Sequence, residues 1–139
     1  MSGYGAGAMR SRYVQDSVTT ASPARLLVML YDRLVLDLQR GEAAQRAGLR
    51  EEANEALLHA QEILLELQMT LDTATWEGAP GLAALYSYLH AELVGANTTG
   101  DADRTAACRQ LVDPLLDAWR QAAASLPQQT SAQQPSTSA

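Results

Sequence analysis

A seven-residue apolar repeat between residues 50 and 72 is the feature that most constrains the fold of this chain. Its members are spaced alternately by four and three residues: Ala53, Leu57, Ala60, Leu64, Leu67 and Leu71. This spacing places all of them on one side of an α-helix, as a seam that packs against other helices in a bundle. No part of the chain sustains the period-two alternation of a β-strand, so strands are not expected.

Three further segments have helical periodicity. The first extends from about Pro23 to Ala47, with Ser22 as its N-cap and Gly48 as its stop. The third helix in the chain extends from about Gly81 to Ala96, a turn follows over residues 97–100, and Asp101 caps the fourth helix. The expected core positions of these three helices are Leu27, Leu30, Leu34 and Leu38; Leu82, Leu85, Leu89, Leu93 and Ala96; and Cys108, Leu111, Leu115, Trp119 and Ala122. Short connections between such helices predict an all-α, antiparallel up-down four-helix bundle.

The length of 139 residues fits one domain. Hydrophobic residues make up 47% of the chain and charged residues 19%, which is the balance of a globular protein. We expect residues 1–12 to be a flexible N-terminus and residues 13–126 to form a single helical-bundle domain. Residues 127–139 have no apolar side chain larger than Ala, so we expect a disordered tail.

The net charge of −6 argues against binding to nucleic acids or to anionic membranes. No apolar run approaches the ~20 residues of a membrane span, and the N-terminal residues lack the apolar core of a secretory signal. A single cysteine, Cys108, excludes an intramolecular disulfide and fits a small core residue. These features predict a soluble cytoplasmic domain without membrane insertion.

Enzymatic chemistry has no motif to support it. The chain contains no Lys, no Gly-rich phosphate loop and no Ser-His-Asp spacing. Its two histidines, His59 and His90, lack the Glu-x-x-His spacing of a di-iron bundle, and a nearby Glu opposes a phosphohistidine at each. We therefore expect solvated or hydrogen-bonded histidines, no catalytic residues, no metal and no cofactor.

The first two helices carry more apolar surface than one seam needs. The additional positions are Leu26, Met29 and Leu36 in the first helix, and Leu58, Leu65 and Met69 in the second. One interpretation is a wide stripe that touches two neighbouring helices at once. The other is a groove that docks a partner helix, for which methionine is suited because its side chain adapts its shape.

Pro114 interrupts the fourth helical segment. Proline donates no backbone hydrogen bond, and its ring clashes with the carbonyl four residues earlier. We therefore expect a bend, or a helix break between Gln110 and Asp113.

Several motifs in the chain resemble those of the FliS family of flagellar export chaperones. They are Tyr13, TASP at residues 20–23, LVMLYD at residues 27–32, LYSYL at residues 85–89, and Asp-Ala-Trp at residues 117–119. The resemblance covers about residues 13–122. The chain departs from the family pattern at two places. Residues 76–84 lack the family's Asn, and Asp113-Pro114 stands where the family's fourth helix continues.

The resemblance implies a non-enzymatic cytoplasmic chaperone. Members of the family bind the disordered C-terminal segment of flagellin, prevent its premature polymerisation and aid its delivery to the flagellar type III export apparatus, a second candidate partner. The candidate flagellin-binding residues here are Tyr13, Val18, Leu26, Met29, Leu36, Leu58, Leu65 and Met69. From the pattern alone, the alternative is a structural or adaptor bundle that binds another amphipathic helix.

Overall fold

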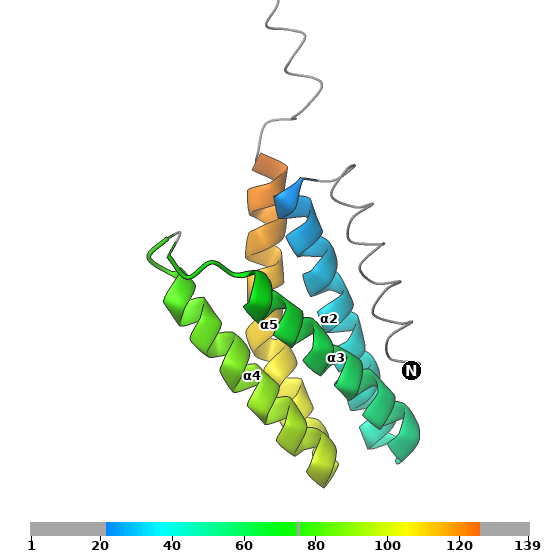
Figure 1. Ribbon diagram of the computed structural model, residues 1–139. Helices are drawn as coiled ribbons and strands as arrows, with labels where there is room; N and C mark the ends of the chain where they lie inside the picture. Colours follow the sequence, from blue (N-terminus) through cyan, green and yellow to red (C-terminus); the bar gives the residue numbers. More distant parts are fainter. Residues whose placement is uncertain (1–21, 75, 126–139) are drawn as a thin grey trace, which may run out of the picture. The chain divides into compact units, whose positions relative to one another are not determined.

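The computed structural model describes residues 22–74 and 76–125, and helices are the only regular secondary structure among them. These helices are α2 (Pro23–Arg46), α3 (Arg50–Thr70), α4 (Ala79–Thr99) and α5 (Ala102–Ser125), shown in Figure 1. The predicted all-α fold class is therefore confirmed. The candidate residues Tyr13 and Val18 lie outside the described residues, as do both predicted unstructured ends, so the predicted domain limits stay a prediction.

The chain divides into two compact units. Residues 30–115 form the larger unit, which contains all of α3 and α4, most of α2 and the first part of α5. The described part of the other unit consists of residues 22–29, which begin α2, and residues 116–125, which end α5.

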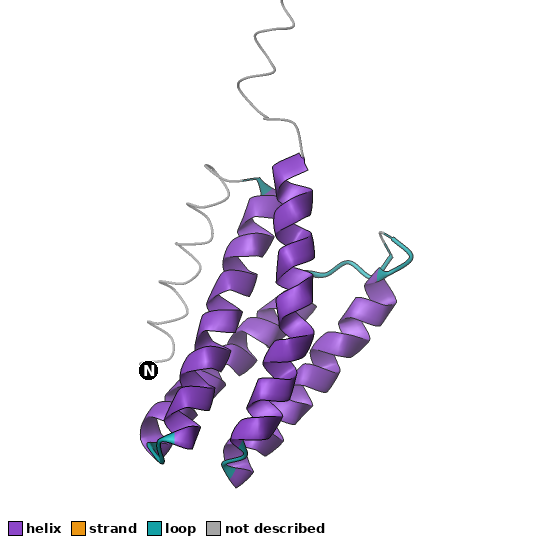
Figure 2. Cartoon of the chain, turned by 180° about the vertical axis from the view of Figure 1, so that it is seen from behind, coloured by secondary structure: helices purple, strands orange, loops and turns teal. Residues whose placement is uncertain are grey.

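Within residues 30–115 the helices run alternately up and down. The connections after α2 and after α4 lie at one end, and the connection after α3 lies at the other (Figure 2). Side-chain hydrogen bonds join α2 to each of the other three helices, through Asp37 and His59, Tyr31 and Tyr86, and Glu42 and Arg109. α3 and α4 pack along one another. This arrangement is the antiparallel bundle that the sequence predicts.

The apolar seam of α3 lies in the core of this unit. Its first five members, Ala53, Leu57, Ala60, Leu64 and Leu67, are all buried, and Leu71 is half-buried. The predicted core positions that are also buried are Leu34 and Leu38 in α2, and Leu89, Leu93 and Ala96 in α4. The repeat in the sequence therefore marks the surface along which the helices pack.

α2 and α3 approach closely at Gly41. A Cβ atom built at this buried glycine would lie 2.5 Å from Cδ2 and 2.9 Å from Cγ of Leu57. Leu57 is itself fully buried. Glycine inside a helix is less favourable than alanine by roughly 0.5–1 kcal/mol, so its presence in α2 is explained by the space that the Leu57 side chain occupies.

A buried pair of tyrosines joins α2 to α4. The hydroxyl groups of Tyr31 and Tyr86 are hydrogen-bonded at 2.7 Å, and the ring centroids lie 6.4 Å apart at an interplanar angle of 57°. Burial, together with this hydrogen bond, raises the pKa of the Tyr86 hydroxyl well above its ordinary value. Each buried hydroxyl thus has a partner, without which it would destabilise the core.

Several predicted helix ends are confirmed. The Ser22 hydroxyl accepts a hydrogen bond from the backbone N–H of Arg25 at 3.2 Å, as an N-cap does. Asp101 caps α5 in the same way, since its carboxylate accepts a bond from the Arg104 N–H at 3.1 Å. Gly48 follows α2 with a φ of 76°, the left-handed conformation expected of a glycine stop.

α4 is longer than the sequence predicts at both ends. It begins at Ala79 rather than Gly81, because Pro80 fits the first turn of a helix, where no backbone donor is needed. The predicted turn over residues 97–99 is wrong: the helix continues to Thr99 and ends at Gly100, with a φ of 70°. The hydroxyl of Thr99 donates to the carbonyl of Gly95, one turn earlier.

The core face of α5 also differs from the prediction. Cys108 is buried as predicted, but Leu111 is 44% exposed and Ala122 is exposed, so their assignment to the core was wrong. Val112 and Thr105 are buried in α5 instead. Residues three and four positions after Cys108 lie on neighbouring parts of the helix surface, and the structure places the fourth one inward.

α5 continues through Pro114, so the predicted break between Gln110 and Asp113 is wrong. Proline has no N–H to donate to the carbonyl of Gln110. The helix therefore runs through this position without that hydrogen bond, and the bend, which is the other outcome expected from the sequence, stays a prediction.

Candidate functional site

Three large apolar side chains are exposed along the outer side of α3. Leu58 and Leu65 are each 45% exposed, and Met69 is 83% exposed. They are separated by seven and four residues, so they lie in one line along the helix. We call Leu58, Leu65 and Met69 the α3 stripe. An aligned set of exposed apolar side chains is typical of an interaction surface.

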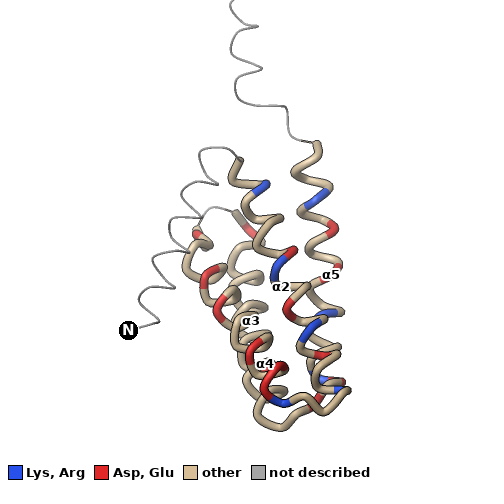
Figure 3. Tube along the Cα trace, turned by 90° about the vertical axis from the view of Figure 1, so that its right-hand side faces the viewer, with Lys and Arg blue, Asp and Glu red and all other residues tan. Residues whose placement is uncertain are grey.

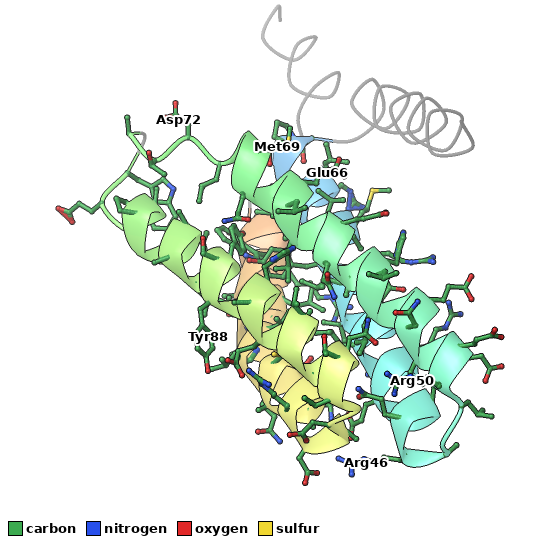
Figure 4. The ribbon with its side chains drawn as sticks, turned by 60° about the horizontal axis from the view of Figure 1, so that its bottom comes forward. Arg46, Arg50, Glu66, Met69, Asp72 and Tyr88 are labelled. Carbon is green, nitrogen blue, oxygen red and sulfur yellow. The ribbon has the colours of Figure 1, made fainter. Side chains whose placement is uncertain are left out.

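Acidic residues accompany the α3 stripe, and acidic bands recur along α3 in Figure 3. Glu51, Glu55 and Glu62 are exposed and continue the same four-and-three spacing as Leu58 and Leu65. Met69 lies near the C-terminal end of α3, far from Arg50 at the opposite end (Figure 4). This side of α3 therefore carries acidic residues toward the start of the helix and apolar ones toward its end.

The candidate residues of α2 are less exposed. Leu26, Met29 and Leu36 are all half-buried. Leu36 belongs to the unit of residues 30–115 together with the α3 stripe, whereas Leu26 and Met29 belong to the other unit. The structure thus brings together Leu58, Leu65 and Met69 on one helix, and of the three α2 candidates only Leu36 lies in the same unit.

A buried carboxylate joins α2 to α3 beside this surface. Asp37 is only 2% exposed, and its Oδ2 is hydrogen-bonded to Nδ1 of His59. Its other oxygen, Oδ1, lies 3.4 Å from Nε of Arg33. His59 is therefore a hydrogen-bonded histidine, one of the two roles that the sequence allows. The burial of Asp37 was missed; its only sequence signal is the Arg33–Asp37 spacing of four residues.

Polar side chains also join the helices at the end of the bundle where α2 meets α4 and α5. Gln45 donates from Nε2 to the carbonyl of Ala96 at 3.0 Å, and its Oε1 accepts a bond from the buried hydroxyl of Thr105 at 2.7 Å. Burial alone would raise the pKa of Glu42, but hydrogen bonds from Arg46 and Arg109 outweigh it and lower the pKa. These hydrogen bonds join α2 to α4 and to α5.

Arg104 of α5 lies against the backbone of α4. Its Nε and Nη2 donate to the two carboxylate oxygens of Glu92 at 2.8 and 3.2 Å. A Cβ atom at Gly95 would overlap this guanidinium group. The hydrogen bond from Arg104 lowers the pKa of the Glu92 carboxyl. Because Gly95 has no side chain, the guanidinium group of Arg104 has space beside α4, where its bidentate ion pair with Glu92 joins α4 to α5.

Cys108 is a free cysteine with a buried side chain. Burial, and secondarily the negative charge of Glu92, raises its pKa to about 11. Only the thiolate reacts with alkylating agents, so iodoacetamide at pH 8 is expected to modify Cys108 at least about 100-fold more slowly in the native protein than in guanidinium chloride. Mass spectrometry of timed samples measures both rates. Equal rates would show that the thiol is accessible in the folded state.

Among the described residues, no group of three or more His, Cys, Asp or Glu side chains could hold a metal ion. The same residues contain no helix long and apolar enough to span a membrane.

Comparison with known proteins gives three findings. Residues 5–126 match the family described as Flagellar protein FliS. The flagellar secretion chaperone FliS of Bacillus subtilis (strain 168) is 36% identical over 110 residues, which are 79% of this chain and 82% of that protein. A crystal structure of a flagellar chaperone from bacteria has a TM-score of 0.67 at 21% identity, covering 83% of this chain and 94% of its own; it supports the fold.

Proposed function

This chain belongs to the FliS family of flagellar proteins, and from that premise we propose that it is a flagellar secretion chaperone that binds the C-terminal segment of flagellin in the cytoplasm. The relative that is 36% identical is itself a flagellar secretion chaperone. Covering the segment prevents flagellin from polymerising before export and hands it to the export apparatus. The role requires binding and release, without catalysis or a cofactor.

The α3 stripe is the observation that carries this proposal. A disordered segment that becomes helical on binding loses about 2–5 kcal/mol or more to ordering, so it needs a long apolar contact. Leu58 and Met69 are eleven residues apart in the helix, which corresponds to about 16 Å at the helical rise of ~1.5 Å per residue. Side chains along that length contact about three turns of a bound helix.

The other candidate residues extend the proposed contact. Leu36 is half-buried in the same unit, so part of its side chain is available to a client. Leu26 and Met29 are half-buried in the other unit. Together with Tyr13 and Val18, they are proposed as further contacts along the client.

Flagellin with and without its C-terminal segment tests the proposal. Using flagellin from the same organism, we expect the full-length protein to co-elute with the chaperone in size-exclusion chromatography and the truncated protein to elute separately. Circular dichroism of the chaperone mixed with the isolated segment should show more helix than the sum of the two components, because the segment folds as it binds. Equal binding of the truncated flagellin would contradict the proposal and favour an adaptor for another helix.

A further inference from the structure

A groove of about 710 Å³ lies between α2 and α3, near the connection that joins them. The small side chains of Ala43, Ala44, Ala47 and Ala56 are among its lining residues. None of the three residues of the α3 stripe lines it. The groove is therefore a second surface, which adjoins the α3 stripe at Glu55.

The groove is bordered by α2 on one side and by α3 on the other, and these two sides, which we call its banks, carry opposite charges. Arg33 and Arg40 line it on α2, whereas Glu52 and Glu55 line it on α3, and all four residues are exposed. Arg33 is engaged by Asp37. Within the part of the chain that the structure describes, Arg40, Glu52 and Glu55 form no hydrogen bond or ion pair with their side chains. Opposite charges thus face the same open groove without neutralising one another.

Such a surface is complementary to itself. A two-fold rotation places the basic bank of one copy against the acidic bank of the other, and the same rotation creates the reciprocal contact. The net charge of −6 opposes unspecific association, but the mixed charges of the groove provide a local attraction. The four lining alanines also matter, because the distance between packed helices depends on the side chains at the contact, and small ones permit a close approach.

We propose that two copies of this chain associate through their α2–α3 grooves as a two-fold symmetric dimer. Arg40 of each copy pairs with Glu55 of the other, and Glu52 lies beside this pair. The ion pairs are at the surface, so they make the association weak and dependent on salt.

Analytical ultracentrifugation of the full chain tests the dimer. In 50 mM NaCl, we expect the mass to rise from monomer toward dimer as the concentration increases to about 1 mM; in 500 mM NaCl, where the screening length falls to roughly 4–5 Å, the monomer should prevail. A chain that stays monomeric throughout this range in 50 mM NaCl would overturn the proposal.

Charge reversals identify the interface. Arg40→Glu and Glu55→Arg should each raise the dimer dissociation constant at least about tenfold, because symmetry makes every substitution act twice. An equimolar mixture of the two variants should regain the wild-type constant. In the mixed dimer, the two reversed side chains face each other across one contact and the two natural ones across the other.

Glu77→Arg is the matched control. It makes the same charge change as Glu55→Arg at an exposed residue of the connection before α4, and it should leave dimerisation unchanged. The assignment of this groove would be overturned if both groove variants dimerise as well as the wild type does. It would also be overturned if their equimolar mixture stays monomeric. Circular dichroism confirms that each variant is folded.

Discussion

Replacing Leu65 with Asp is expected to weaken flagellin binding at least about 100-fold, the size of effect found at the centre of binding surfaces. Leu65 lies between Leu58 and Met69 in the α3 stripe. A carboxylate there would be covered by apolar client side chains without a partner, which is strongly unfavourable. The free energy of unfolding should fall by only about 1 kcal/mol, because nearly half of the side chain is already exposed.

Leu111→Asp is the matched control for this variant. Leu111 is 44% exposed on α5, almost the same as Leu65, but it lies outside the α3 stripe. It should therefore bind flagellin as the wild type does. Isothermal titration calorimetry gives the affinities, and thermal unfolding followed by circular dichroism gives the stabilities. Normal binding by Leu65→Asp, or loss of its folded state, would contradict the proposed role of the stripe.

Gly41→Val is expected to destabilise the bundle by about 3 kcal/mol, because the added side chain overpacks the core. Its Cβ alone would lie within 3 Å of two atoms of the buried Leu57 side chain. Valine is stiff at χ1 and cannot turn its methyl groups away from the helix surface. Urea unfolding of the variant and the wild type measures the difference.

Two further variants separate the close contact from a general effect of valine. Gly81→Val places the same side chain in α4, where nothing lies within 4 Å of the new Cβ, and it should change stability by less than about 0.5 kcal/mol. The double variant Gly41→Val, Leu57→Ala should lose less unfolding free energy than the two single variants lose in sum. The smaller alanine removes the clash with the new valine, and the valine fills part of the space that the leucine leaves. Strict additivity would show that Leu57 is not the obstacle.

Periodicity predicted the parts of the fold that depend on long apolar repeats. The seam of α3 carries its signal over six positions, so a single helix orientation satisfies all of them, and the buried residues agree with it. α5 has fewer large apolar residues. Leu111 and Val112 both suit a core that includes Cys108, and only the neighbouring helices determine that Val112 turns inward. The sequence repeat therefore predicted α3 better than α5.

Contacts between residues distant in the chain were not predictable from spacing. From the sequence, Asp37 is expected at the surface, as aspartates usually are. Its burial depends on His59, which lies on another helix and forms a hydrogen bond with it. Tyr31 and Tyr86 both belong to motifs of the FliS resemblance, but their shared hydrogen bond appears only in the folded chain. In the candidate site, the apolar positions of α3 were visible in the sequence. The charged banks of the α2–α3 groove were not, because they combine two helices.

The contact of Arg104 with Gly95 also constrains how related sequences can diverge. A side chain larger than hydrogen at position 95 competes with the guanidinium group for the same space, and displacing that group deprives Glu92 of its bidentate partner. Positions 92, 95 and 104 should therefore change together among homologues. The guanidinium group is the end of a flexible, partly exposed side chain, so a larger residue at position 95 is accommodated when Arg104 moves away, and the ion pair with Glu92 is then lost.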